Sequence, residues 1–296
     1  MFLRRRPLPP SVVELDGPFS HELVHTRGIR LHVATAGRPE DPLVLLLHGT
    51  FGGWFEFRRV IAPLAARGFR VAAVDFRGYG LSDRPPSTAG DALRTAAGDI
   101  AGLIRALGHD TALIVGADTG GTVAWALASH YPEMVTGLVS VSAAHPVDLR
   151  RASVARPWRH VGTLSRPLWP LLGAAAYRRH LHSSTTPDFR HSPGFGEEVA
   201  LRVRAGRISN TRPWRLRTNR LLTAPVSARW LHTQVSAPTL LLQPPLPVWR
   251  HLGRRSAARV TGDLNVRHVA RTRDLPHLEN PPAFVEAVAE FAERHL

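Results

Sequence analysis

The hydrophobic pattern of the first half of the chain alternates between short apolar runs and segments of helical periodicity. The apolar runs are typical of buried strands and lie at residues 42–47, 69–75, 111–116 and 135–142. Helices are predicted between them, over residues 54–67, 91–107 and 120–130. Two earlier strands are predicted within residues 21–37, around a turn at Arg27-Gly28. This alternation with short connections predicts a parallel sheet that is covered on both faces.

The alternation stops at residue 146 and resumes after residue 235. Between these positions Pro, Trp and Arg are frequent, and the helical patches are short, at residues 168–181 and 197–207. The last part predicts a strand, a helix, a strand and a helix, at residues 239–242, 248–260, 266–272 and from Pro282 onward. We therefore expect an α/β core made of residues 1–145 and 236–296, with residues 146–235 inserted as a helical lid.

Charge distinguishes the inserted segment and the helix that follows it. All 38 basic residues are Arg, and the formal net charge is +15. Residues 146–260 contain 20 of these Arg and four acidic residues, so the whole excess lies there. A solvated surface that reflects codon usage is the simpler interpretation. Because Trp and Leu pairs lie among the Arg, weak contact with an anionic membrane surface is the functional alternative. No nucleic-acid-binding motif accompanies the charge.

Composition excludes several classes of protein. The 296 residues contain no Cys, which excludes disulfides, thiolate metal sites and a Cys nucleophile. No apolar stretch approaches the roughly 18 residues that a membrane span needs. The basic N-terminus is not followed by the apolar run of a signal peptide. We expect a cytoplasmic protein, peripheral to the membrane at most, with no metal and no cofactor. The sequence does not indicate an oligomeric state.

The segment Leu113–Ala124 carries the most informative motif. A predicted buried strand leads into Asp118, which has Gly at positions −2, +2 and +3, and a predicted helix follows at once. This is the pattern of a nucleophile elbow, in which small neighbours permit a strained turn that exposes the nucleophile above the sheet. The alternative interpretation is that Asp118 caps the helix that follows it.

With the elbow, three further segments make residues 21–296 resemble the α/β-hydrolase superfamily. Residues 48–58 (HGTFGGWFEFR) resemble its oxyanion loop, and residues 276–281 (PHLENP) resemble the loop that carries its histidine. Residues 75–85 (DFRGYGLSDRP) resemble a D-x-R-G-x-G-x-S-D-x-P loop of the epoxide hydrolase and haloalkane dehalogenase branch. The resemblance implies the α/β-hydrolase fold, with a mostly parallel sheet, helices on both faces and an inserted lid.

The resemblance also implies a reaction. A carboxylate at the elbow displaces a leaving group from saturated carbon, so Asp118 would form an alkyl ester with a small apolar substrate such as an epoxide. Water activated by His277 would then hydrolyse the ester. The backbone N–H groups of Thr50 and Thr119 would stabilise the oxyanion that forms in this step. A haloalkane dehalogenase, another α/β hydrolase and a catalytically degraded binding protein with a basic lid remain as alternatives.

The acid that orients the histidine in relatives is missing from both of its usual places. The chain reads Gln243-Pro244-Pro245-Leu246 after one strand and Ser142-Ala143-Ala144-His145 after the other. Asp148 is the candidate acid, although it could equally be a helix cap or an Arg partner, and Asp263 and Asp274 are weaker candidates.

The lid departs from the pattern as well. Epoxide hydrolases use two lid tyrosines as hydrogen-bond donors to the ring oxygen. Here Tyr177 is a candidate donor, although it could equally be a packing residue, and Trp214 stands where the second tyrosine is expected. An indole N–H can also donate, and dehalogenases hold the departing halide in this way. They commonly place a second Trp directly after the nucleophile, where this chain has Thr119.

Overall fold

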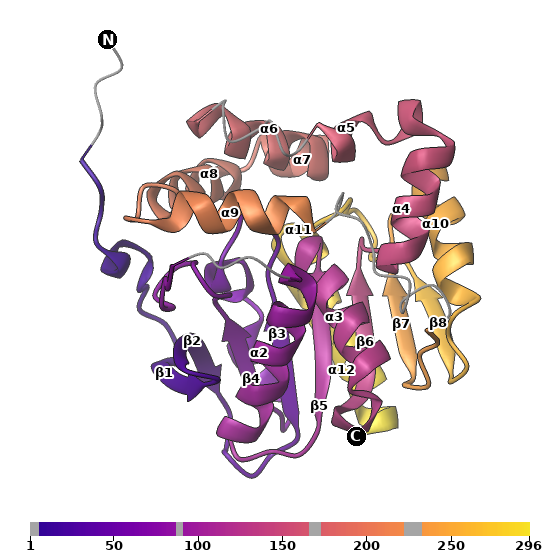
Figure 1. Ribbon diagram of the computed structural model, residues 1–296, viewed down its shortest axis with the longest axis horizontal. Helices are drawn as coiled ribbons and strands as arrows, with labels where there is room; N and C mark the ends of the chain where they lie inside the picture. The colour runs from indigo at the N-terminus through magenta and orange to yellow at the C-terminus, as the bar shows by residue number, and fades with distance from the viewer. Residues whose placement is uncertain (1–5, 87–90, 166–172, 222–232) are drawn as a thin grey trace.

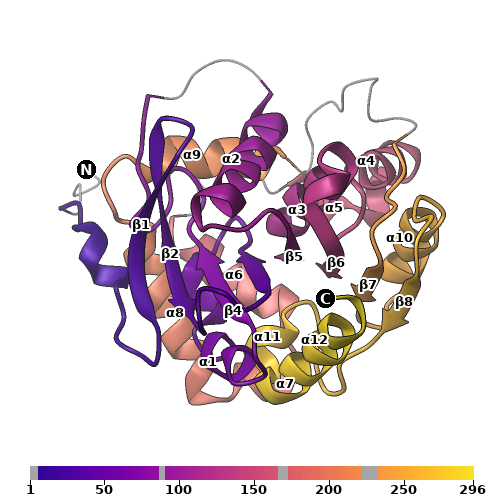
Figure 2. The same ribbon diagram turned by 90° about the horizontal axis from the view of Figure 1, so that it is seen from below.

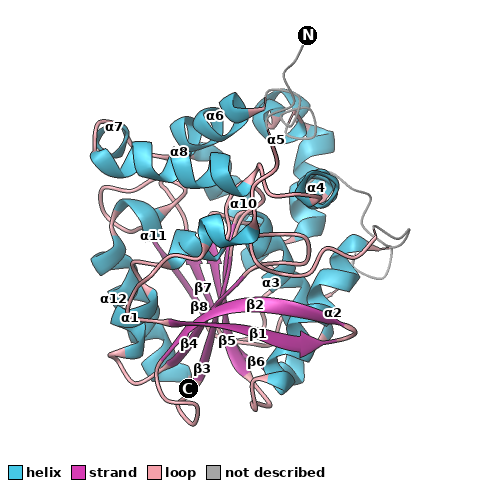
Figure 3. Cartoon of the chain, turned by 90° about the vertical axis from the view of Figure 1, so that its left-hand side faces the viewer, coloured by secondary structure: helices cyan, strands magenta, loops and turns pink. Residues whose placement is uncertain are grey.

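The computed structural model describes residues 6–86, 91–165, 173–221 and 233–296. Their centre is an eight-stranded sheet in the order β1-β2-β4-β3-β5-β6-β7-β8 (Figures 1 and 3). The strands are β1 (Ser20–Thr26), β2 (Ile29–Ala36), β3 (Leu43–Leu47), β4 (Arg70–Val74), β5 (Ala112–Ala117), β6 (Val135–Val141), β7 (Thr239–Leu242) and β8 (Leu264–Arg267). β2 pairs antiparallel with β1 and β4, and the pairs from β4 to β8 are parallel. The expected, mostly parallel sheet is confirmed.

The first two strands form the expected hairpin. Arg27 and Gly28 join them, and both have positive φ, at 47° and 77°. Two successive residues of this kind match the right-handed twist of the flanking strands. The hairpin therefore adds an antiparallel edge to the parallel part of the sheet.

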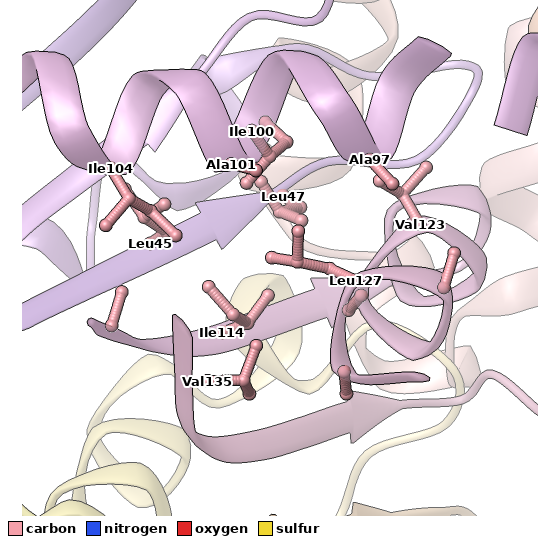
Figure 4. Close-up of a cluster of buried hydrophobic side chains, with 14 of the residues drawn as sticks. Leu45, Leu47, Ala97, Ile100, Ala101, Ile104, Ile114, Val123, Leu127 and Val135 are labelled. Atoms are coloured by element: carbon pink, nitrogen blue, oxygen red, sulfur yellow. The ribbon is translucent and has the colours of Figure 1, made fainter. Parts of the chain in front are cut away.

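Helices cover both faces of the sheet (Figure 2). α2 (Ala92–Ala106) and α3 (Thr119–His130) lie on one face, and α1 (Ile61–Ala65) and α12 (Pro281–His295) lie on the other. Figure 4 shows Ile100 and Ile104 of α2 above Leu45, Leu47 and Ile114 of the central strands. These strands are apolar throughout because both of their faces are buried.

A group of helices lies at the end of the sheet where the parallel strands terminate (Figure 1). Between β6 and β7 the structure describes α4 (Pro146–Ala155), α5 (Val161–Leu164), α6 (Ala174–Ser184), α7 (Pro187–Arg190), α8 (Pro193–Ala205) and α9 (Thr211–Arg220). α10 (Pro247–Ala257) and α11 (Pro276–Glu279) follow later in the chain, and the short 3-10 helices are η1 (Pro10–Val13), η2 (Trp54–Phe57), η3 (Pro132–Met134) and η4 (Pro157–Arg159). No helix within the described ranges is both long and apolar enough to cross a bilayer.

Two predicted elements differ from the structure. The helix expected over residues 54–67 is divided into η2 and the short α1, because Pro63 lacks an N–H and obstructs a helix that continues from the preceding turn. The last strand ends at Arg267 instead of residue 272, and the positive φ of Arg271, 58°, interrupts extended backbone there. The expected helix over residues 168–181 lies partly outside the described residues, which begin again at Gly173.

Candidate active site

Asp118 lies at a strained turn between β5 and α3. Its φ is 52° and its ψ is −119°, and its side chain makes no capping hydrogen bond to α3. A Cβ on Gly116 would lie 2.5 Å from the Gly120 carbonyl oxygen, and a Cβ on Gly120 would lie 2.2 Å from that of Leu47. These contacts explain why the turn needs glycine. The geometry favours the elbow over the capping interpretation.

The two expected oxyanion residues are adjacent. Thr50 Oγ1 donates a hydrogen bond of 2.9 Å to Thr119 Oγ1, and both residues are fully buried. A Cβ built on Gly49 would lie 2.9 Å from Asp118 Oδ2, so the carboxylate lies directly against the oxyanion loop. The loop after β3 and the start of α3 thus meet beside Asp118.

His277 is fully buried at the start of α11. Its ring lies 4.8 Å from the ring of Phe57 and 5.7 Å from that of Phe284. Burial, and then the charge of Arg202, lower the pKa of His277 to about 3. The ring is therefore neutral at pH 7 and can accept a proton, but the imidazolium that would form is destabilised.

No described residue hydrogen bonds to either ring nitrogen of His277. The candidate acid Asp148 lies elsewhere: its carboxylate accepts hydrogen bonds of 2.7 and 3.1 Å from Arg259. That partner is 111 residues away along the chain, so the sequence did not reveal the pair. Asp274 accepts a bond of 2.8 Å from Trp249 Nε1. Neither Asp148 nor Asp274 therefore hydrogen bonds to His277 in the part of the chain that the structure describes.

A cavity lies beside Asp118 and beneath the α6 segment. Its described lining includes His180 and Ser184 of α6, Ser142 after β6, and Trp249 of α10. The His180 side chain is almost fully buried, and its ring lies 4.9 Å from the Phe51 ring of the oxyanion loop. Neither the sequence pattern nor the family motifs single out His180 among sixteen histidines.

Neither Tyr177 nor Trp214 is among the described residues that line this cavity. The Tyr177 ring packs 6.0 Å from Phe51, and the Arg215 guanidinium lies 4.5 Å above it. Trp214 packs so closely over Gly78 that a Cβ there would lie 2.0 Å from its Cγ, and it lines a separate pocket against α2. The described lining of this cavity therefore does not support the expectation that these two residues are donors, which stays a prediction. His180 lies three residues after Tyr177 on α6, which is about one helical turn. His180 does line the cavity.

A buried charge cluster connects the oxyanion loop to α8. Arg202 of α8 pairs with Glu56 of η2 and with Glu198, and all three side chains are at least 98% buried. Glu56 also accepts a hydrogen bond of 3.3 Å from the Gly49 N–H. Burial raises the pKa of Glu56 to about 7, although the charge of Arg202 acts in the opposite direction. Glu56 is the one acidic residue among the aromatic residues of Trp54–Phe57, and this pattern was the sequence signal for the cluster. The motifs considered above did not include it.

The Arg202→Met variant should be strongly destabilised, because two buried carboxylates lose their shared cation. We expect a loss of about 3–5 kcal/mol in the free energy of unfolding, measured by urea denaturation. Arg67→Met is the matched control, since Arg67 pairs with the partly exposed Glu286 and Glu293, and should cost less than about 1 kcal/mol. Equal losses in the two variants would contradict a stabilising role for the cluster.

Sequence comparisons agree with this geometry. A family model described as alpha/beta hydrolase fold matches residues 42–172. AB hydrolase superfamily protein YfhM of Bacillus subtilis is 44% identical over 136 residues, which cover 46% of this chain and 48% of that protein. Epoxide hydrolase B of Mycobacterium tuberculosis is 36% identical over 124 residues, which cover 41% of this chain and 35% of that protein. The matched part thus spans less than half the length of these relatives.

Solved structures show the same fold. Epoxide hydrolase A from Mycobacterium thermoresistibile superposes with a TM-score of 0.71 at 21% identity, covering 93% of this chain and 98% of that one. The enol-lactonase from Burkholderia xenovorans LB400 superposes with a TM-score of 0.69 at 18% identity, covering 93% and 100%. The chain therefore has the α/β-hydrolase fold, and the matching family model covers residues 42–172 of it. About half of the chain is similar in sequence to epoxide hydrolases.

Proposed function

We propose that this chain hydrolyses epoxides through a covalent ester on Asp118. The observation that carries the proposal is a carboxylate at the strained elbow, beside a cavity and against the oxyanion loop. Serine would be the usual residue there for acyl transfer, whereas a carboxylate suits attack at saturated carbon. The sequence similarity to epoxide hydrolases supports the same reaction.

In the first step, a carboxylate oxygen of Asp118 attacks a ring carbon and the C–O bond of the epoxide breaks. The departing oxygen must gain a proton, and His180 faces the same cavity as Asp118. We assign His180 as the donor, in place of Tyr177 and Trp214. The products of this step are an alkyl ester on Asp118 and a free hydroxyl on the substrate.

In the second step, His277 takes a proton from water, and the resulting hydroxide attacks the ester carbonyl. The N–H groups of Thr50 and Thr119 stabilise the oxyanion. Its collapse breaks the bond to the substrate oxygen, which takes up the proton held by His277, and the diol leaves. Asp118 is left as the carboxylic acid and releases its proton to solvent, which restores the carboxylate, and solvent returns a proton to His180. The net reaction adds one water molecule to the epoxide.

The dehalogenase alternative lacks support in the cavity. Trp214 lies in the other pocket, and Thr119 stands directly after the nucleophile. Trp249 does line the cavity, but its indole N–H donates to Asp274. A halide would therefore meet no indole donor among these residues.

Product analysis tests the proposal and the role of His180 together. Wild type should convert aryl and alkyl epoxides to diols, and should release no halide from matched haloalkanes. The His180→Phe variant should lose about 10²-fold or more in the rate of Asp118 alkylation, because general acid catalysis contributes that much. Tyr177→Phe is the matched lid control and should retain most of the rate. Halide release without diol formation would refute the proposed reaction, and full activity in His180→Phe would refute the donor.

A further inference from the structure

A cluster of exposed apolar side chains lies at one edge of the lid helices. Val154 lies in the last turn of α4, Trp158 is in η4 and Val161 begins α5. Their exposed fractions are 67%, 68% and 60%, within eight consecutive residues. Isolated exposed apolar residues are common, but an exposed indole between two exposed valines marks a contact surface more strongly.

Basic side chains surround this cluster. Arg151, Arg156 and Arg159 are exposed in the same segment, which contains no acidic residue from Leu149 to Ser165. None of the three forms an ion pair with a described residue. Their guanidinium groups are therefore available to an external anion.

α10 adds a second set of arginines from about 100 residues further along the chain. Leu252 of α10 packs against Leu149 and Ala152 of α4, and Figures 1 and 2 both show the two helices side by side. The outer face of α10 carries the exposed Arg254 and Arg255.

The charges of arginines from both segments lower the pKa of the same histidine. The pKa of His251 on α10 is lowered, first by burial and then by the charges of Arg255, Arg156, Arg159 and Arg254. The arginines of residues 156–159 and those of α10 are therefore close enough to act on the same side chain. No acidic residue lies between Pro247 and Gly262 to neutralise it.

We propose that this surface, formed by residues 151–161 and by Arg254 and Arg255, docks onto an anionic lipid bilayer. An indole and two aliphatic side chains suit the boundary between headgroups and acyl chains. The surrounding guanidinium groups match lipid phosphates and carboxylates. Nucleic acid fits less well, because the valines would meet its charged backbone. The proposal does not depend on the epoxide reaction.

Sedimentation with vesicles tests the docking surface. We compare vesicles of phosphatidylcholine alone with vesicles that also contain phosphatidylserine, at low and high salt. The wild type should bind the anionic vesicles at low salt, and binding should weaken as salt rises. The Arg156→Gln/Arg159→Gln double variant should bind roughly 25-fold more weakly, at about fivefold per arginine. Trp158→Ser should also weaken binding.

The control removes the same charge from another face. Arg94→Gln/Arg105→Gln changes two exposed arginines of α2 and should leave vesicle binding near the wild-type value. All three variants should keep the wild-type turnover of a water-soluble epoxide, which separates docking from catalysis. Equal binding to neutral and anionic vesicles, equal weakening by the control, or tighter binding to duplex DNA than to anionic vesicles would overturn the proposal.

Discussion

The Asp118→Asn variant should gain no mass when it is incubated with an epoxide, whereas His277→Gln should gain the mass of one substrate molecule and keep it. An amide at position 118 removes the nucleophile, so turnover should fall by about 10⁴-fold or more. The glutamine at position 277 leaves the nucleophile in place but removes the base that activates water, so the ester accumulates. Intact-mass spectrometry of both variants measures these outcomes directly.

Asp110→Asn is the matched control, because it changes an exposed carboxylate near the start of the same strand. It should turn over substrate at the wild-type rate. An unmodified His277→Gln variant, beside an active wild type, would contradict the assigned roles of both Asp118 and His277.

Hydrolysis of the ester should be the slow step in the wild type. In a serine protease, loss of the acid that orients the histidine lowers turnover by about 10⁴-fold. Here His277 hydrogen bonds to no described acid, and Arg202 further disfavours its protonated form. Rapid-quench kinetics should show a fast burst of alkylation followed by slow release of diol.

An introduced acid should accelerate the slow phase. Ser142→Glu and Leu246→Asp place a carboxylate after β6 or after β7, where relatives carry the acid. The buried Ser142 Oγ has no hydrogen-bond partner among the described residues, and Ser142 lines the Asp118 cavity. Ser142→Gln is the matched neutral control and should not accelerate release. A wild type without a burst, with rapid turnover, would show that another group already assists His277.

Local patterns predicted the parts of the site that lie at strand ends. Asp118 follows a motif of a few residues and Thr50 lies in the loop after β3, so the order of the strands was enough to place the elbow against that loop. A short motif also singled out His277, which lies against Phe57 and Phe284. The Arg27-Gly28 hairpin was predictable for the same reason, because its turn depends on two adjacent residues.

The remaining features depend on contacts between distant segments. The pairing of Asp148 with Arg259 requires α4 to lie on α10, and the pairing of Glu56 with Arg202 requires α8 to lie on the oxyanion loop. His180 reaches the cavity through the packing of α6, which no local period specifies. Trp214 packs over Gly78 because that residue has no side chain, a contact that joins positions far apart in the sequence.

A single turnover in water labelled with ¹⁸O tests the covalent mechanism most directly, with enzyme in excess over epoxide. If Asp118 forms the ester, the oxygen added to the first diol comes from its carboxylate. Mass spectrometry should then find the label in the peptide that contains Asp118 and unlabelled oxygen in the diol. Label in the first diol, with none in that peptide, would show that water attacks the epoxide directly and would contradict the account.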